Sequence, residues 1–417
     1  MATTIHIDDL ANPVLTDIQR MGVDFGESRH TELSVDAVCD AAASATGLFD
    51  FGPEDFRERL EVQLTEMNDD PDRTGLGRML MFADCTRYMK NRLRINDLLR
   101  RHPEILDLPI EKPVIVVGLP RSGTTHLVNL LASDTRFRSM PLWESFEPVP
   151  DPNEPLSPDG VDPRWTRCQQ NWEAMVAGAP LVAAMHPMEP DHVHEENELM
   201  ASDFSNYNLE WVARAPKWRD YFLAHDQTPH YAYMKTVLQI LQWFNPRERW
   251  VLKCPQHLEQ LGPLLTTFPD ATVVMTHRDP VAVVQSTATM LAYGARASYR
   301  TVNPQWYGDY WTERIGVLLD ASLRDRGLLP AGRTVDVFFD EYMADEMGTL
   351  ERIYAAAGIE LNDHARSEID AYQAAHPRGH AGQVTYDLRN DFGVTPEQVR
   401  SRYASYFSAF PVRIEVL

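Results

Sequence analysis

One stretch of the chain, residues 113–132 with the sequence PVIVVGLPRSGTTHLVNLLA, constrains the fold more than any other. Its first residues form a short, continuous β-branched run, which is typical of a strand buried on both faces of a parallel sheet. A glycine-containing loop at 118–125 follows the run directly and leads into an apolar helical pattern. Strand, loop and helix in this order form the phosphate-binding unit of many α/β proteins. We therefore predict a parallel α/β fold that binds a phosphate at this loop.

Other parts of the chain are predicted to form the strands that pair with this one. Four more runs predict strands, at Phe137–Leu142, Trp250–Cys254, Thr272–His277 and Thr334–Phe339, and helical patterns follow most of them. We predict a P-loop-like parallel β-sheet of about five strands flanked by helices. Residues 1–107 form a helical N-terminal region and residues 108–417 the α/β domain. Residues 143–249 form a mostly helical insertion in that domain, which we expect to shape a substrate pocket.

The charge and composition of the chain limit which kinds of molecule it can bind. The chain of 417 residues has 39 Lys and Arg against 61 Asp and Glu, a net charge of −22. Such a surface repels polyanions, so we expect no nucleic-acid partner. The four cysteines are far apart, and neither a secretory signal nor an apolar stretch long enough to span a membrane is visible. We expect a soluble, cytoplasmic protein without integral membrane association; the oligomeric state is open.

The loop at 118–125 differs from a nucleoside-triphosphate loop at one position. Four residues separate Gly118 from Gly123, as in a Walker A motif, but Thr124 stands where that motif has its Lys. Without the Lys, the loop can still hold a single phosphate with the backbone N–H groups of residues 122–125 at a helix N-terminus, and Arg121 adds a positive charge. The alternative is a strand-to-helix turn whose glycines serve geometry only.

The segment VVGLPRSGTTHL resembles the 5′-phosphosulfate loop of sulfotransferases that use 3′-phosphoadenosine 5′-phosphosulfate (PAPS). The Pro-Arg-Ser-Gly-Thr-Thr form is similar to that of tyrosylprotein sulfotransferases and many bacterial members. Cytosolic members carry Lys where Arg121 stands. The resemblance implies PAPS as co-substrate, a small-molecule acceptor and no metal. It also implies that Arg121, Ser122, Gly123, Thr124 and Thr125 contact the donor.

The same resemblance predicts a second donor site for the 3′-phosphate. ATVVMTHRDPVAVVQS ends a predicted strand at Arg278 and places Ser286 eight residues later. Because the carboxyl ends of parallel strands share one edge of a sheet, both phosphate sites can face one nucleotide. By similarity to a late loop of cytosolic members, Arg378 and Gly379 complete the site, with Arg389 as an alternative cation.

Three residues are predicted to act in sulfuryl transfer, which needs positioning, charge stabilisation and a base. The resemblance implies Glu144 as the base and Lys253 and Arg121 as cations beside the sulfuryl group and the leaving phosphate. For Glu144 the alternative is a helix cap or solvated carboxylate; for Lys253 it is a structural ion pair.

A cluster of titratable residues offers another base. The segment 185–198, MHPMEPDHVHEENE, contains His192, His194 and Glu195, which can bind the acceptor or replace Glu144. A solvated acidic helix start is the alternative. A metal site is disfavoured because no H-E-x-x-H pattern is present. Aromatic residues of the insertion, such as Tyr207 and Trp211, line the pocket or belong to the core.

The resemblance thus implies a sulfotransferase that transfers a sulfuryl group from PAPS to a hydroxyl or amine of a small molecule. Two alternatives stay open at this point. One is a P-loop nucleoside kinase or NTPase, against which Thr124 argues. The other is a noncatalytic nucleotide-binding protein with the same fold.

Overall fold

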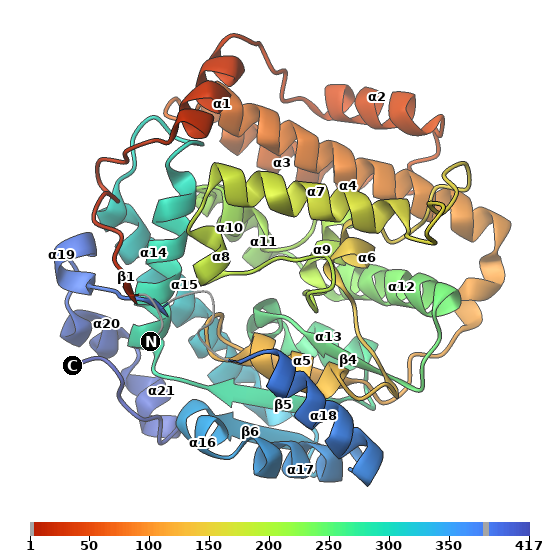
Figure 1. The fold of residues 1–417 in the computed structure, drawn as a ribbon, viewed down its shortest axis with the longest axis vertical. Helices are drawn as coiled ribbons and strands as arrows, with labels where there is room; N and C mark the ends of the chain where they lie inside the picture. The colour runs from red at the N-terminus through yellow and green to blue at the C-terminus, as the bar shows by residue number, and fades with distance from the viewer. Residues whose placement is uncertain (1–3, 378–382) are drawn as a thin grey trace.

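The computed structural model describes residues 4–377 and 383–417. Figure 1 shows a parallel sheet in the lower half of the molecule, the insertion helices in the middle and helices α1 to α4 across the top. The strands are β1 (Thr4–Ile5), β2 (Val114–Gly118), β3 (Phe137–Arg138), β4 (Arg249–Lys253), β5 (Thr272–His277), β6 (Thr334–Phe338) and β7 (Gln383–Val384). Strand β1 pairs with β7; the other five form the main sheet.

The predicted α/β class and the five-stranded parallel sheet are confirmed. The strand order is β3-β4-β2-β5-β6, and every pair is parallel. Strand β2 is the central strand, with Val114 opposite Val251 on one side and Thr272 on the other. The loop after β2 therefore opens at the middle of the carboxyl edge, where open α/β sheets bind ligands.

The predicted strand at Phe137–Leu142 is wrong in length. Strand β3 ends at Arg138, and α6 begins at Leu142 with Pro141 as its N-cap residue. Proline lacks the N–H that would continue a ladder, so the strand cannot extend through it. Instead the His194 N–H donates to the Met140 carbonyl oxygen at 2.8 Å and the Leu142 N–H to the His192 carbonyl oxygen at 2.8 Å. This antiparallel contact ties residues 192–194 to the edge of the sheet.

Helices cover both faces of the sheet because the strands are apolar on both faces. Ile115 and Val117 of β2 pack against α12 to α15, whereas Val114 and Val116 pack against α5, α17 and α18. The helices of this part are α5 (Thr124–Ala132), α13 (Leu261–Thr267), α14 (Pro280–Ala295), α15 (Pro304–Asp325), α16 (Phe339–Ala344), α17 (Glu346–Ala357), α18 (Asp363–Ala375), α19 (Leu388–Phe392), α20 (Pro396–Arg402) and α21 (Ala404–Ala409).

The N-terminal helices and the insertion share a third core. Phe56, Leu60 and Leu93 of the N-terminal helices pack with Phe204 and Trp218 of the insertion. The N-terminal helices are α1 (Asp17–Glu27), α2 (Val35–Thr46), α3 (Phe56–Asp69) and α4 (Gly75–Arg101). The insertion carries α6 (Leu142–Phe146), α7 (Pro163–Gly178), α8 (Val182–Met185), α9 (Asn197–Met200), α10 (Leu209–Val212), α11 (Pro216–Ala224) and α12 (Thr228–Phe244). Short 3₁₀ helices lie at Pro103–Asp107, Ala201–Asp203, Pro255–Glu259 and Arg326–Leu328.

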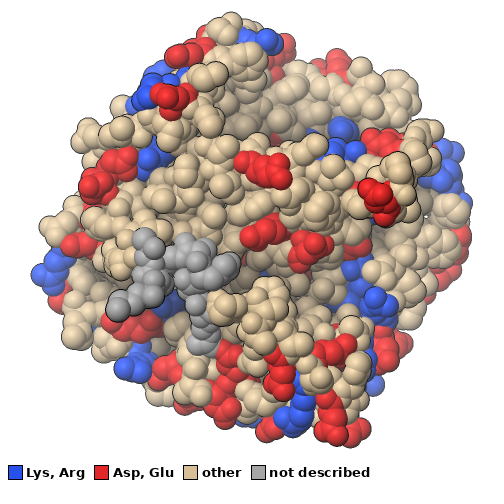
Figure 2. All heavy atoms as spheres, viewed as in Figure 1, with Lys and Arg blue, Asp and Glu red and all other residues tan. Residues whose placement is uncertain are grey.

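The surface is charged and predominantly acidic. Figure 2 shows Asp and Glu gathered along the edge that α16, α17 and α18 form, with Lys and Arg scattered between them. None of the helices within 4–377 and 383–417 has the length and apolar character that crossing a membrane requires.

Candidate active site

The loop after β2 has the backbone of an anion-binding site. Gly123, with a φ of +83°, is the N-cap residue of α5, and no side chain caps the helix. The first N–H groups of α5 are therefore open to a ligand at the positive end of the helix dipole. Gly118 is required for another reason: a Cβ at this position would lie 1.8 Å from Thr276 Oγ1 on the neighbouring strand.

Arg121 is a partly buried cation that pairs with no carboxylate among the described residues. Its φ of +62° is strained for a residue with a side chain. Arg121 Nε donates to Ser286 Oγ at 3.0 Å, and Ser286 Oγ donates to the Tyr386 hydroxyl at 3.1 Å. Burial lowers the pKa of the Arg121 guanidinium. A partly buried cation without a carboxylate partner, beside open helix amides, favours binding of an anion.

Arg278 lies beside the loop and forms an ion pair with a carboxylate of the same chain. Its Nη1 donates to the Arg121 carbonyl oxygen at 2.6 Å. Its Nε and Nη2 donate to the two carboxylate oxygens of Glu415, each at 2.8 Å. The guanidinium also lies 4.1 Å from the ring centroid of Phe339. The structure thus brings Arg278, Arg121 and Ser286 together, although Arg278 contacts the loop backbone rather than Ser286.

Lys253, at the end of β4, faces the loop from the other side. Its side chain is 1% exposed, and its Nζ donates to Thr125 Oγ1 at 3.3 Å and to Glu195 Oε1 at 2.5 Å. The Lys253 backbone N–H donates to Glu196 Oε1 at 2.7 Å, which fixes the end of the strand. A buried ammonium group therefore joins the loop at 118–125 to a carboxylate of the predicted titratable cluster.

Glu144 has different surroundings. Its side chain is buried on α6, and Glu144 Oε2 accepts a hydrogen bond from Arg138 Nη2 at 2.6 Å. The Arg138 guanidinium in turn packs on Trp250, 5.0 Å from its ring centroid. Among the described residues, Glu144 forms no hydrogen bond or ion pair with Thr125 or Lys253.

The histidines of the cluster are neutral side chains at neutral pH. Burial lowers the pKa of His192 to about 3, and the charge of Lys253 acts in the same direction. Burial also holds the pKa of His186 and His194 well below the ordinary value. His192 lies 6.0 Å from His194 between ring centroids. Within the described residues no three His, Cys, Asp or Glu side chains are arranged to hold a metal ion.

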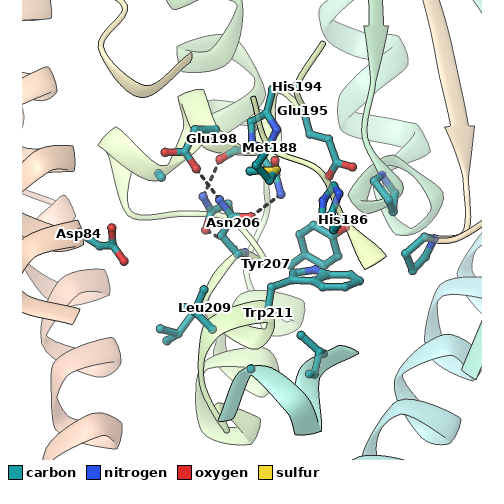
Figure 3. Close-up of a pocket in the computed structure, with 18 of the residues that line it drawn as sticks. Asp84, His186, Met188, His194, Glu195, Glu198, Asn206, Tyr207, Leu209 and Trp211 are labelled. Carbon is teal, nitrogen blue, oxygen red and sulfur yellow. Dashed lines mark hydrogen bonds between the residues drawn. The ribbon is translucent and has the colours of Figure 1, made fainter. Parts of the chain in front are cut away.

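A cavity of about 410 Å³ runs from the loop into the insertion. Arg121, Thr124 and Thr125 line one end and Glu195 and His194 adjoin them. Figure 3 shows His194 and Glu195 above the rings of Tyr207 and Trp211. Most of the wall is apolar or aromatic, and α4 of the N-terminal region supplies Met81, Cys85 and Tyr88 to it. The other apolar residues of the wall are Phe146, Met175, Val182, Met188, Phe204, Leu209, Val212, Met290 and Leu291.

Several residues of the site carry no motif in the sequence. Asp84 and Arg87 reach the cavity from α4, Tyr386 contacts Ser286, and Glu415 lies on Arg278. Only Tyr386 had a signal, because it follows the Gly- and Arg-containing loop in which we predicted donor contacts. Arg378 and Gly379 of that loop lie outside the described residues. Arg389 pairs with Glu397 on the surface, with Nη2 3.0 Å from each carboxylate oxygen.

Known proteins resemble this chain in sequence and in fold. Residues 113–363 match the protein-family model described as "Sulfotransferase family". The omega-hydroxy-beta-dihydromenaquinone-9 sulfotransferase Stf3 of Mycobacterium bovis is 23% identical over 319 residues, which are 70% of this chain and 79% of Stf3. The Mycobacterium tuberculosis protein of the same name gives the same values.

Two crystal structures are similar over almost the whole chain. Sulfotransferase STF9 from Mycobacterium avium has a TM-score of 0.83 and 27% identity, covering 93% of this chain and all of its own. Sulfotransferase STF1 from Mycobacterium tuberculosis H37Rv has a TM-score of 0.76 and 26% identity, covering 89% of this chain and 98% of its own. The helical N-terminal region is thus part of an architecture that these proteins share.

Proposed function

Because the chain belongs to the sulfotransferase family, we propose that it transfers the sulfuryl group of PAPS to a hydroxyl, or an amine, of a small apolar acceptor. The observation that carries this proposal is one continuous cavity, which is lined at one end by Thr124 and Thr125 and along its length by apolar side chains. One compartment can then hold donor and acceptor in contact, which sulfuryl transfer requires.

The residues around the loop suit this donor. The open N–H groups of residues 122–125 bind its 5′-phosphate, and Arg121 supplies a positive charge there. Ser286 and Arg278 bind the 3′-phosphate, with Arg378 and Gly379 completing that site. A nucleoside triphosphate is a poorer fit, because Thr124 leaves the loop without the Lys that its phosphates need.

The chemistry is an in-line displacement at sulfur. The donor supplies the activated sulfuryl group; the acceptor oxygen forms a new O–S bond while the bond from sulfur to the bridging oxygen breaks. The electron pair of that bond remains on the phosphate, where Lys253 and Arg121 stabilise the developing charge. The acceptor proton goes to a carboxylate, and the products are a sulfate ester and 3′,5′-phosphoadenosine (PAP).

We assign the base role to Glu195 rather than Glu144. Glu195 lines the cavity and lies 2.5 Å from Lys253 Nζ, beside the loop. The sequence pointed to Glu144 as the first candidate, but its contact with the buried Arg138 leaves it occupied as an ion-pair partner. When the donor anion attracts Lys253, the Glu195 carboxylate is released to accept a proton.

The acceptor binds between the N-terminal helices and the insertion. Helix α4 and the insertion build most of the cavity wall, so we propose that the helical region 1–107 and the insertion 143–249 select the acceptor, while the remainder of the α/β domain 108–417 holds the donor. The name of the Stf3 relatives gives a hydroxylated menaquinone as acceptor, and an apolar alcohol also suits the wall of this cavity.

The first experiment compares nucleotides by thermal unfolding of the full chain. PAP should raise the melting temperature with a logarithmic dependence on concentration, whereas ADP or ATP with Mg²⁺ should raise it far less. Arg278→Ala and Ser286→Ala should weaken the effect of PAP. Stabilisation by ATP with Mg²⁺ above that by PAP would instead indicate a kinase or NTPase.

The second experiment measures transfer itself. The enzyme is incubated with sulfur-labelled PAPS and a set of apolar alcohols, and labelled products are separated. Lys253→Ala should reduce the rate by roughly a hundredfold or more while PAP still binds. Binding of PAP without transfer to any acceptor would favour a noncatalytic protein.

A further inference from the structure

Helix α1 carries a row of apolar side chains at the surface. Ile18, Met21 and Phe25 follow one another at intervals of three and four residues, so they lie along one side of the helix. We call these three residues the α1 stripe. They are 55%, 70% and 48% exposed, and Val14, just before the helix, is 73% exposed. Single exposed apolar residues are common, but a periodic row indicates contact with something apolar outside the chain.

The apolar side of α1 is wider than its contact with α4. Gly26 packs so closely that a Cβ on it would lie 2.1 Å from the Leu76 backbone nitrogen, and a Cβ on Gly22 would lie 3.3 Å from Leu76 Cδ2. At 100° per residue, these glycines lie directly beside the stripe. The opposite side of the helix is polar and consists of Asp17, Arg20, Asp24 and Glu27. The packing on α4 therefore covers one half of the apolar side and leaves the stripe uncovered.

Helix α1 is attached to two elements that wall the cavity. Gln19 Nε2 donates to the Gly178 carbonyl oxygen at 2.6 Å, at the end of α7, and α7 also lines the cavity. On α4, Leu80 is 50% exposed, while its neighbour Met81 lines the cavity. Figure 1 shows α1 together with α4 at the top of the molecule. The uncovered stripe and the apolar cavity thus belong to adjoining parts of the structure.

A series of contacts joins α1 to an exposed residue of the cavity wall. Val212, at the end of α10, lines the cavity and is 54% exposed. Two residues later, Arg214 Nη2 donates to Asp72 Oδ2 at 2.9 Å. The Arg300 backbone N–H donates to the Asp72 carbonyl oxygen at 2.8 Å, and Arg300 Nη2 donates to Glu27 Oε1 of α1 at 2.8 Å. An apolar route can therefore lead from the surface near α1 into the cavity.

A cation lies at the end of the stripe. The Arg29 guanidinium is 4.3 Å from the ring centroid of Phe25, and Arg29 pairs with no carboxylate among the described residues. Such a group can reach a phosphate while its stem stays over the ring. Residues 14–29 hold three acidic and two basic side chains, so no broad positive patch surrounds it. The stripe thus suits a surface that offers apolar chains and phosphate together without a high negative charge.

A second copy of the chain suits the stripe less well than a lipid surface. The 11 residues of α1 span about 16 Å, and one side of a helix is about 10 Å wide, so the stripe offers on the order of 200 Å². A stable dimer buries about 800 Å² on each partner. A phospholipid bilayer sets no such minimum, because the apolar side of a single helix inserts between its headgroups.

We propose that α1 docks the protein on a phospholipid bilayer, with Ile18, Met21 and Phe25 inserted among the lipids and Arg29 on the headgroup phosphates. The wall of the cavity at Val212 then lies near the lipid, and an apolar acceptor passes from the bilayer into the cavity with little exposure to water. The inference goes beyond the proposed function, which concerns the cavity and the donor loop.

The test measures binding of the full chain to phosphatidylcholine vesicles by flotation. The chain should float with the vesicles, and Met21→Gln combined with Phe25→Gln should lower the partition coefficient by roughly tenfold or more. Arg29→Gln should lower it less. Phe49→Gln is the matched control, because Phe49 is 77% exposed outside the stripe, and it should leave the partition coefficient unchanged. The melting temperatures of all variants should be alike, since the substituted side chains are at the surface.

Three results would overturn the proposal. The first is absence of vesicle binding, or equal partitioning of the double variant and Phe49→Gln. The second is binding that requires phosphatidylserine, because a chain with a net charge of −22 should gain nothing from anionic lipid. The third comes from sedimentation without vesicles: a dimer that the double variant loses would assign the stripe to self-association.

Transfer assays separate this inference from the proposed function. With a long-chain alcohol held in vesicles, the double variant should show a raised KM. With a short, water-soluble alcohol, its KM and kcat should equal those of the unsubstituted chain. Vesicle binding through the stripe without transfer to any acceptor would contradict the proposed function alone. Transfer to both alcohols with the same KM in the two proteins would contradict this inference alone.

Discussion

At the scale of single residues, Glu144 and Glu195 differ in what their carboxylates contact. Both were candidates for the base, and their position in the sequence could not separate them. Glu144 is paired with a buried guanidinium at 2.6 Å, whereas Glu195 lines the cavity and contacts Lys253. An ion pair between residues six positions apart leaves no pattern in the sequence, because it depends on where β3 ends and α6 begins.

Glutamine substitutions distinguish the two carboxylates. Glu195→Gln keeps the shape but cannot accept a proton, so kcat should fall by roughly a hundredfold or more with PAP binding retained. Glu144→Gln leaves Arg138 as an uncompensated buried charge and should lower the free energy of unfolding by about 3 kcal/mol. Steady-state kinetics and urea unfolding measure the two effects. A large loss of kcat in Glu144→Gln with unchanged stability would return the base role to Glu144.

Because His192 is neutral in the folded chain, the stability of the protein should depend on pH. Its pKa is about 3 in the folded chain and 6.5 ordinarily, so the unfolded chain takes up the proton first as the pH falls. The stabilisation is therefore present above pH 6.5 and is lost between pH 6.5 and 3. His192→Gln should reduce the loss between pH 7 and 5 by on the order of 1 kcal/mol. Urea unfolding at both pH values tests this, and identical slopes in both proteins would contradict it.

At the scale of elements, the sheet was predictable because each strand is a local apolar run followed by a helical pattern. Strands β2, β4, β5 and β6 lie within one residue of their predicted bounds, and the loop at Gly123 follows β2 as expected. The end of β3 was predicted wrongly, because Pro141 precedes α6 and cannot continue the strand as the apolar run suggested. The C-terminal tail was also missed: Glu415 is 137 residues from Arg278, and no local pattern relates them.

The C-terminal residues around Glu415 are held so that its carboxylate pairs with the Arg278 guanidinium, which we propose binds the 3′-phosphate. Asp279 Oδ2 accepts from the backbone N–H groups of Glu415 and Val416 at 2.8 and 3.2 Å, while its Oδ1 accepts from the Val281 N–H at the start of α14. One carboxylate thus anchors both the tail and the helix. Because a carboxylate and a phosphate use the same guanidinium edge, Glu415 competes with the nucleotide.

Removing that carboxylate should therefore strengthen donor binding. Glu415→Gln is expected to lower the Kd for PAP by several fold, since a neutral amide is a weaker partner for Arg278. Glu313→Gln is the matched control, because Glu313 pairs with Arg402 on the surface, and it should leave the Kd unchanged. Weaker binding of PAP in Glu415→Gln would show instead that the tail positions Arg278 for its phosphate.

At the scale of the whole molecule, the acceptor end of the cavity depends on the docking of the N-terminal helices. Asp203, in the insertion, is the centre of that contact: its Oδ1 accepts from Arg59 Nη2 at 2.9 Å and from Arg92 Nη1 at 2.8 Å. Its Oδ2 lies 2.6 Å from His230 Nδ1. The carboxylate therefore joins α3 and α4 to α12, above the core that Phe56 and Trp218 share.

Loss of the Asp203 carboxylate should lower the free energy of unfolding of the whole molecule, which unfolds in one cooperative transition. Asp203→Ala leaves two buried guanidinium groups without their common partner, so we expect the free energy of unfolding to fall by about 3 to 5 kcal/mol. Asp55, which meets Arg59 from the exposed side, is the control, and Asp55→Ala should cost less than about 1 kcal/mol. Urea unfolding should show one transition in both variants, because the shared core prevents the N-terminal helices from unfolding alone. A separate early transition in Asp203→Ala, with PAP binding preserved, would mean that those helices form an independent unit that merely covers the cavity.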